Sequence, residues 1–264
     1  MSRRQHKQAV RNAFDRAADS YDGAAVVQRE ICHRLAEFAS SVPCVGAPRR
    51  ALDAGCGTGY GLDLLASLCP GAELYALDFA PAMLTRLAAI RPGTDTSLLC
   101  GDLEALPLAS GAMDVVWSSL ALQWCDPAVA LAEIARVLRP GGVAWLATLG
   151  PATLWELRDA FTAVDGAQHV IRFHAIEHWR HTAAVAGLQI VAADSQPVHA
   201  LAPDLRQLLR DIKAIGAHSV GSEPRPALTR AGWRMLEGRY DAHRRADGQL
   251  PATYDLILLA LRKG

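Results

Sequence analysis

Glycine occupies every second position from residue 55 to residue 61, where an apolar segment changes to a helical pattern. Glycines in such a strand-to-helix turn allow a ligand to approach the backbone, and the helix N-terminus offers N–H groups without intrahelical partners. The segment therefore predicts a ligand-binding loop that includes Gly55 and Gly57. Taken alone, it does not distinguish mononucleotide binders from dinucleotide binders, because both use such loops.

The spacing of these glycines excludes two common phosphate sites. A dinucleotide fingerprint needs a third glycine three residues after the second, and the two possible frames place Tyr60 and Leu62 there. No Gly-Lys-Ser/Thr sequence follows, so the P-loop pattern also fails. Asp53, two residues before Gly55, would repel a pyrophosphate but would attract a ligand with a cationic amino group.

Aspartates close the next two expected strands. Asp78 ends the second strand, where an acid can accept hydrogen bonds from both hydroxyls of a ribose. Asp102 follows the third strand, where it can accept from an adenine amine, with Met83 and Leu103 on the faces of the ring. Each aspartate alone is explained equally well as a helix cap or a turn residue. Together, an amine, a ribose and an adenine without phosphate describe S-adenosylmethionine, and Ser119 completes the expected cofactor contacts.

Alternating strand and helix patterns must position these residues. Apolar segments expected to be strands lie at 51–53, 73–78, 97–100, 114–118 and 143–148. Helical patterns lie between them at 60–68, 81–90 and 127–138, the last of which we expect to stop at the Pro-Gly-Gly of 140–142. This alternation predicts an α/β fold with a mostly parallel sheet and helices on both faces.

The two ends of the chain have different patterns. Residues 7–39 have helical periodicity. After Gly150, helical patterns at 153–164, 176–186, 201–215 and 229–240 are interrupted by a strand-like segment at 188–193 and a final strand at 253–261. We expect a single domain over 1–264, with a helical arm or lid at 1–48, a cofactor-binding core at 49–150, and a substrate-side region with a helical insertion at 151–264.

Composition excludes several classes of protein. The 27 Lys and Arg residues balance 27 Asp and Glu residues, which argues against a nucleic-acid-binding protein. The six cysteines are at least 12 positions apart, so no metal site is expected and the thiols suit a reducing compartment. The N-terminus lacks the apolar region of a secretory signal, and no apolar run is long enough to span a membrane. We therefore expect a cytoplasmic protein.

The segment 52–59, Asp78, the Gly-Asp pair at 101–102 and the Leu-Arg-Pro-Gly-Gly at 138–142 together resemble the class I S-adenosylmethionine-dependent methyltransferases. This resemblance implies a seven-stranded, Rossmann-like sheet. In that sheet the last strand, here 253–261, lies antiparallel beside the fifth.

The whole chain resembles a narrower family, the malonyl-[acyl-carrier protein] O-methyltransferases of biotin synthesis. The stretches that carry this resemblance are 7–18 with Tyr21, 101–108, 117–124, 172–173, 212–218 and 250–254. The Leu-Gln-Trp at 122–124 and the Lys-Ala-Ile-Gly-Ala at 213–217 are the most discriminating, because a generic methyltransferase does not need them.

The resemblance implies that the free carboxylate of a malonyl thioester attacks the sulfonium methyl group of the cofactor and becomes a methyl ester. A carboxylate with a pKa of ~4 is already ionised at neutral pH, so we expect no catalytic general base. The task of the protein is to align oxygen, methyl and sulfur and to remove water.

Five residues are candidates for substrate binding. Arg172 and Lys213 are the candidate partners of the substrate carboxylate, and His218 is a candidate donor to the thioester carbonyl. The resemblance implies that Tyr21 closes over the cofactor as part of a lid, and that Trp124 lines the methyl-transfer chamber. Each also has a purely structural explanation, as a surface charge, a bonded polar residue or a packing aromatic.

The charge distribution and the expected fold do not by themselves identify the methyl acceptor. Residues 50–150 have a net charge of −5 and the rest of the chain +5. A basic flank suits an acidic acyl-carrier protein, although a solvated surface explains it equally. Two other functions remain possible at this point: methylation of another small acceptor, such as a quinone precursor or a polycarboxylate, and a non-catalytic scaffold that binds the cofactor.

Overall fold

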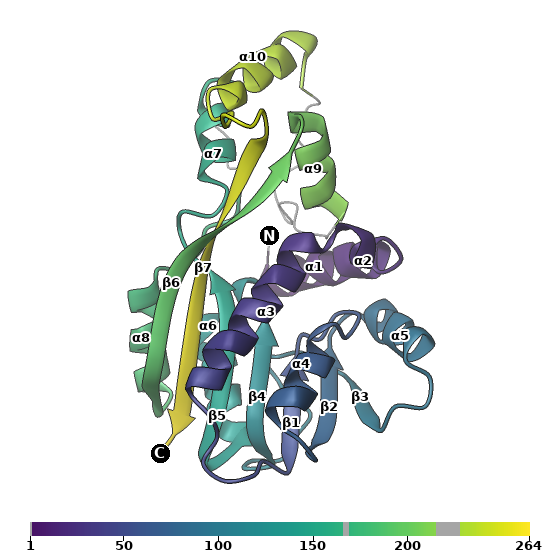
Figure 1. The fold of residues 1–264 in the computed structure, drawn as a ribbon, viewed down its shortest axis with the longest axis vertical. Helices are drawn as coiled ribbons and strands as arrows, with labels where there is room; N and C mark the ends of the chain where they lie inside the picture. The colour runs from purple at the N-terminus through teal and green to yellow at the C-terminus, as the bar shows by residue number, and fades with distance from the viewer. Residues whose placement is uncertain (1, 166–168, 215–227) are drawn as a thin grey trace.

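The computed structural model describes residues 2–165, 169–214 and 228–264. Within these residues, seven strands form one sheet in the order β3-β2-β1-β4-β5-β7-β6 (Figure 1). The strands are β1 (Arg50–Ala54), β2 (Glu73–Asp78), β3 (Thr96–Cys100), β4 (Met113–Ser119), β5 (Leu138–Leu149), β6 (Leu188–Ala202) and β7 (Leu250–Lys263). The first five run parallel, and β7 is antiparallel between β5 and β6. The expected mostly parallel sheet with an antiparallel last strand is confirmed.

Helices cover both faces of the sheet. The described helices are α1 (Arg3–Ala17), α2 (Tyr21–Ala24), α3 (Val26–Ser41), α4 (Gly61–Leu68), α5 (Pro81–Ile90), η1 (Leu122–Trp124), α6 (Pro127–Val137), α7 (Trp155–Thr162), α8 (Ile176–Val185), α9 (Leu205–Ala214) and α10 (Arg230–Asp241). Successive strand residues point to opposite faces, so Val115 packs in the core under α3 and α4, whereas Val116 packs in the core under α6 and α8. Burial on both faces explains why the strand segments are nearly continuous apolar runs.

The N-terminal segment, for which a helical pattern is expected over 7–39, consists of three helices. A capping box at Ser2 and Gln5 starts α1 four residues earlier than expected. Helix α1 ends at Ala17, and α2 and α3 begin at Tyr21 and Val26. Helix α1 contacts α5 and lies beyond the carboxyl ends of the central strands (Figure 1). The arm is thus placed over the edge of the sheet where ligands bind in α/β folds.

The region after Gly150 contains much more strand than expected. β6 continues to Ala202 instead of stopping at 193, so the expected helix at 201–215 is wrong at its start. The segment pairs with β7 residue by residue, and Pro197 is tolerated because β6 is an edge strand. Figure 1 shows this long strand pair extending past the other strands toward α7, α9 and α10.

The Pro-Gly-Gly at 140–142 lies inside β5 and not in a separate turn, which corrects the expected boundary. Helix α6 ends at Val137, and the register between β4 and β5 shifts between the pairs Met113–Leu138 and Val115–Val143. The extra residues form an irregularity at which Gly141 has a φ of +77°. Among the described residues, no helix is long and apolar enough to cross a membrane.

Candidate active site

The β1–α4 turn is built as a glycine cradle. Gly55 has a φ of +86°, and a Cβ there would lie 2.3 Å from the Cβ of Ala121. Gly59 has a φ of +87°, and a Cβ there would lie 2.3 Å from Leu87 Cδ1. Both the backbone conformation and the close approach of neighbours require glycine at these two positions.

Asp78 holds this turn in place. Its Oδ2 accepts a hydrogen bond from the Gly57 N–H at 2.9 Å, and its Oδ1 accepts one from the Ala80 N–H at 2.8 Å. Burial raises the pKa of Asp78 to about 6, although the backbone donors act in the opposite direction. The carboxylate expected to bind a ribose is therefore also a fixed part of the loop.

A cavity of about 80 Å³ opens beside the loop, and we call it the glycine-loop cavity. All the expected cofactor-binding residues except Asp53 line it, namely Gly55, Gly57, Asp78, Met83, Asp102, Leu103 and Ser119. Lys7, Val10, Phe14 and Tyr21 of the N-terminal arm close its other side. The arm expected to act as a lid therefore forms a wall of this cavity.

Asp53 lies in an adjoining cavity of about 50 Å³, the Asp53 cavity, which shares Tyr21, Gly55, Gly57 and Ser119 with the first. The Asp53 side chain is buried, and burial together with the charge of Asp78 raises its pKa to about 8. Burying a carboxyl group is costly without a compensating partner. A ligand ammonium group would supply such a partner.

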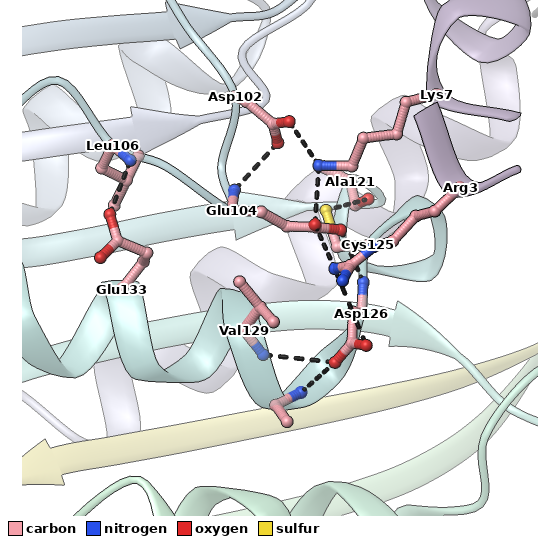
Figure 2. Close-up of polar contacts among 11 residues, drawn as sticks. Arg3, Lys7, Asp102, Glu104, Leu106, Ala121, Cys125, Asp126, Val129 and Glu133 are labelled. Atoms are coloured by element: carbon pink, nitrogen blue, oxygen red, sulfur yellow. Dashed lines mark hydrogen bonds and ion pairs between the residues drawn. The ribbon is translucent and has the colours of Figure 1, made fainter. Parts of the chain in front are cut away.

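Asp102 has a protein partner that the sequence analysis missed. Its Oδ1 accepts from the Glu104 N–H at 2.9 Å, and its Oδ2 forms an ion pair with Lys7 (Figure 2). Lys7 Nζ lies 2.7 Å from Glu104 Oε2, and Glu104 Oε1 accepts from the Asp126 N–H at 2.8 Å. Burial alone lowers the pKa of Lys7, but the two carboxylates hold it above its usual value. The two acidic residues of the Asp-Leu-Glu sequence at 102–104 were the available indication that a basic residue binds here.

A second cavity of about 340 Å³, the apolar chamber, borders the first. The two share Phe14, Tyr21, Leu120 and Trp124, and the rings of Phe14 and Trp124 meet edge to face at 5.7 Å. The remaining lining is mainly apolar and comes from α7, α9, the segment 149–154 and the segments around Phe173 and Tyr254, together with Gln28 of α3 and Gln123 of η1.

The structure brings three of the five expected substrate-binding residues to this chamber. Tyr21, Trp124 and Lys213 line it. Arg172 is absent from its lining, whereas both neighbours in sequence, Ile171 and Phe173, are present. His218 lies outside the described residues.

Backbone strain is concentrated at the apolar chamber. Among the described residues, the two non-glycine residues with positive φ are Leu120 (56°) and Leu154 (53°), and both line the chamber. Gln123 Nε2 donates to the Leu120 carbonyl oxygen at 2.6 Å and so fixes one of these conformations. Strain of this kind is most often found at functional sites.

The polar groups of the chamber are mostly uncharged. Burial raises the pKa of Tyr21 well above its usual value and that of Tyr254 to about 12, so both are neutral phenols at physiological pH. The oxygens Gln28 Oε1 and Gln123 Oε1 are buried and have no hydrogen-bond partner in the described part of the chain. His169 stacks on Phe161 and pairs with Asp165.

These cavities fit S-adenosylmethionine. Gly55 and Gly57 present backbone without side chains to both cavities, and the carboxyls of Asp53 and Asp78 suit an ammonium and a ribose. The glycine-loop cavity is lined by Met83 and Leu103, both buried, which suit the faces of an adenine ring.

The fold and the glycine cradle define a class I S-adenosylmethionine-dependent methyltransferase. Residues 52–146 match the model of the methyltransferase domain family. A solved structure from Bacillus halodurans, described as that of a putative methyltransferase, is similar in fold, with a TM-score of 0.62 and 17% identity over 87% of this chain and 98% of the other.

The relatives identify the family more narrowly. The chain is 46% identical to the malonyl-[acyl-carrier protein] O-methyltransferase of Dechloromonas aromatica, over 98% of this chain and 96% of the relative. It is 44% identical to the enzyme of the same name from Laribacter hongkongensis, over 95% of this chain and 87% of the relative. The chain belongs to the malonyl-[acyl-carrier protein] O-methyltransferase family, and S-adenosylmethionine is its cofactor.

Proposed function

We propose that this methyltransferase converts the free carboxylate of malonyl-acyl-carrier protein, or of malonyl-coenzyme A, into its methyl ester, an early step of biotin synthesis. The observation that carries the proposal is the shared wall of Phe14, Tyr21, Leu120 and Trp124 between the glycine-loop cavity and the apolar chamber. These four residues mark the junction of the two cavities. The methyl group of a cofactor in the glycine-loop cavity and the carboxylate of an acyl thioester in the apolar chamber would meet at this junction. The family relationship supports the same acceptor.

The cofactor, when bound, supplies an electrophilic methyl group on a sulfonium. Gly55 and Gly57 would hold it by close approach of the backbone, Asp78 at the ribose and Asp53 at the amino group. Lys7 and the Glu104 N–H each occupy one acceptor direction on a different oxygen of Asp102, so each oxygen keeps a lone pair that would accept from the adenine amine. Ser119 lies between the two cavities that receive the adenosine and amino-acid parts.

The substrate carboxylate is ionised without help from a base. The neutral phenol of Tyr21 can donate a hydrogen bond to it without removing its charge. The aromatic pair of Phe14 and Trp124 excludes water from the junction, which strengthens the attack of an anion on a cation. Catalysis therefore rests on position and desolvation.

Lys213 is the better candidate for an ionic contact with the substrate. It lines the chamber, and its exposed position on α9 places it at the rim. Arg172 is not part of the lining, so the carboxylate role that the sequence allows for it is less well supported. The role of His218 as a donor to the thioester carbonyl stays a prediction.

The three regions of the chain have separate tasks in this proposal. Residues 1–48 form the lid, 49–150 bind the cofactor, and 151–264 bind the acceptor. We also propose that the enzyme works in the cytoplasm without nucleic-acid or membrane partners. The six free cysteines support a reducing compartment.

An acceptor comparison tests the proposed function. Purified enzyme with methyl-labelled S-adenosylmethionine is offered malonyl-carrier protein, malonyl-coenzyme A, a quinone precursor and a polycarboxylate. We expect label on the malonyl thioesters, and growth of a biotin-requiring strain that lacks its own malonyl methyltransferase. Label on the quinone precursor or the polycarboxylate alone would refute the acceptor, and cofactor binding without transfer to any of them would indicate a scaffold.

A further inference from the structure

A cavity of about 430 Å³ lies between the start of α3, the end of β6 and α9, and we call it the α9 cavity. Its walls come from α2 and α3 on one side and from the long β6–β7 pair and α9 on the other. The lining includes Gly23 and Gln28 on the first side and His199, Asp211, Ile212 and Tyr254 on the second. None of the cofactor-binding residues is among them.

The α9 cavity meets the apolar chamber at three residues. Gln28, Ile212 and Tyr254 line both cavities. Gln28 also lines the Asp53 cavity, so its side chain stands where three spaces converge. The α9 cavity therefore adjoins the apolar chamber, and we call their boundary at Gln28, Ile212 and Tyr254 the constriction.

The lining of the α9 cavity and the constriction suits an uncharged chain that carries amide groups. Most of the walls are apolar, and the Tyr254 hydroxyl is neutral at physiological pH, with a pKa that burial raises further to about 12. Gln28 Oε1 is buried and lacks a hydrogen-bond partner in the described residues. A buried acceptor without a partner is costly, and a ligand N–H would satisfy it.

Charge argues against an anion inside the α9 cavity. Asp211 lines it, and its Oδ1 accepts a hydrogen bond from Gln207 Nε2 at 2.6 Å. A carboxylate or phosphate beside this residue would be repelled. A ligand with charges only at its ends, and neutral amides between them, fits both the acid and the apolar walls.

We propose that the α9 cavity and the constriction at Gln28 bind the pantetheine arm of the acyl thioester, with Gln28 accepting a hydrogen bond from an amide N–H of the arm. This assignment rests on the proposed function, because only a carrier-bound or coenzyme A-bound acceptor has such an arm. The arm is uncharged between its thioester and its phosphate and contains two amides. The malonyl end then lies in the apolar chamber and the phosphate lies outside the α9 cavity.

Substrates with shortened arms test the role of Gln28. The acceptors are malonyl-carrier protein, malonyl-pantetheine and malonyl S-methyl thioester, which has no amide. For Gln28→Leu we expect KM to rise about tenfold or more for the first two and to stay within about twofold for the third. Gln189→Leu, at an exposed position on β6, is the matched control and should change none of them. Cofactor affinity, measured by calorimetry, should be unchanged in Gln189→Leu, and the same measurement on Gln28→Leu separates any effect on the Asp53 cavity from the effect on the arm.

A bulky side chain at Gly23 tests the α9 cavity independently. A Cβ at Gly23 would have no heavy atom within 4 Å, so a larger side chain can be added there without a clash at its base. Gly23→Trp should reduce kcat/KM for malonyl-carrier protein at least tenfold and leave the S-methyl thioester unaffected. Gly23→Ala should behave as the parent with both acceptors.

Three results would overturn the assignment. Equal losses on all three acceptors in Gln28→Leu would show a merely structural role. Unchanged kinetics in both Gln28→Leu and Gly23→Trp would place the arm elsewhere. If the parent enzyme methylates no malonyl thioester at all, both the proposed function and the arm assignment fail. If the parent methylates the S-methyl thioester as efficiently as malonyl-carrier protein, the arm assignment alone is contradicted.

Discussion

Lys7 of helix α1 forms an ion pair with Asp102 at the carboxyl end of the sheet, beside the glycine-loop cavity. Glu104 shares the same ammonium group, and Arg3 one turn earlier also reaches Glu104 (Figure 2). The N-terminal arm is therefore attached by charge to the loop that is expected to bind adenine. The same arm supplies Phe14 and Tyr21 to the wall between the two main cavities.

Replacing Lys7 tests whether this ion pair holds the arm over the cofactor. In Lys7→Met we expect the dissociation rate of S-adenosylmethionine to rise about threefold to tenfold, because a partly buried ion pair with two carboxylates is lost. Stopped-flow fluorescence measures the rate. Arg4→Met, an exposed residue on the same helix, is the control. Identical rates in Lys7→Met and the parent would mean that the arm is held by packing alone.

Asp78 accepts a hydrogen bond from the Gly57 N–H of the loop and is expected to bind the ribose of the cofactor, so its replacement should weaken cofactor binding in two ways. In Asp78→Asn we expect affinity for S-adenosylmethionine to fall more than tenfold, because the charged acceptor for the ribose and the Gly57 N–H is lost. Titration calorimetry provides the measurement. Asp63→Asn, which removes an exposed ion pair with Arg91, should bind as the parent does. Equal affinity in Asp78→Asn would refute the ribose assignment.

The affinity for the cofactor should depend on pH through Asp53. Without ligand its pKa is about 8, and a bound ammonium group favours the ionised form, so binding releases a proton below that pH. The affinity of the parent relative to Asp53→Asn should therefore increase from pH 6 to pH 8. A ratio that is constant over this range would show that the amino group does not contact Asp53.

The same raised pKa affects stability with the opposite sign. The folded protein without cofactor holds a proton on Asp53 that the unfolded chain loses near pH 4. The free energy of unfolding contributed by this group should therefore fall as pH rises from about 4 to about 8. Denaturant unfolding of the parent and of Asp53→Asn measures it, and a parent whose stability rises more steeply than that of the variant would contradict the assignment.

Gly55 is expected to tolerate no side chain. In Gly55→Ala the new Cβ would lie 2.3 Å from the Cβ of Ala121, and the positive φ adds strain. We expect loss of measurable cofactor binding together with a lower melting temperature. Gly71→Ala has a similar φ of +79° but no neighbour within 4 Å, so it isolates the strain from the clash. Equal effects of the two substitutions would show that the close approach at Gly55 is unimportant.

Replacing Lys213 should raise KM for the acceptor more than replacing Arg172. Lys213→Ala should raise KM for malonyl-carrier protein about fivefold to tenfold and leave cofactor affinity unchanged, because its side chain lines the apolar chamber. Arg172→Ala should change KM less, because Arg172 is not part of that lining. Steady-state kinetics with both substrates varied will decide, and a larger effect at Arg172 would reverse the assignment.

The cofactor half of the molecule could be predicted from sequence because its signals are local. The glycines at 55–61 and the aspartates at strand ends are fixed by turns and strand termini, which leave a pattern in neighbouring residues. The expected helix at 81–90 coincides with α5. Proline in the first turn marks its start, and the regular apolar face marks how far it continues.

The features that were missed depend on pairing between distant segments. The ion pair of Lys7 with Asp102 joins residues 95 positions apart, so the acidic sequence at 102–104 indicates a cation partner but does not identify Lys7 as that partner. The last nine residues of β6 contain Asp, Ser, Gln and Pro, and they form a strand only because β7 supplies a partner for each of them. The constriction at Gln28 likewise requires α3, α9 and β7 to be placed together.

The most direct test of the account is the chemical identity of the methylated product. Malonyl-carrier protein is incubated with the enzyme and methyl-labelled S-adenosylmethionine, and the purified carrier is then treated with mild alkali. We expect one labelled methyl group per malonyl unit, released as methanol because it is an ester. Label that resists hydrolysis, or a carrier that acquires none while the cofactor binds normally, would contradict carboxylate methylation by this enzyme.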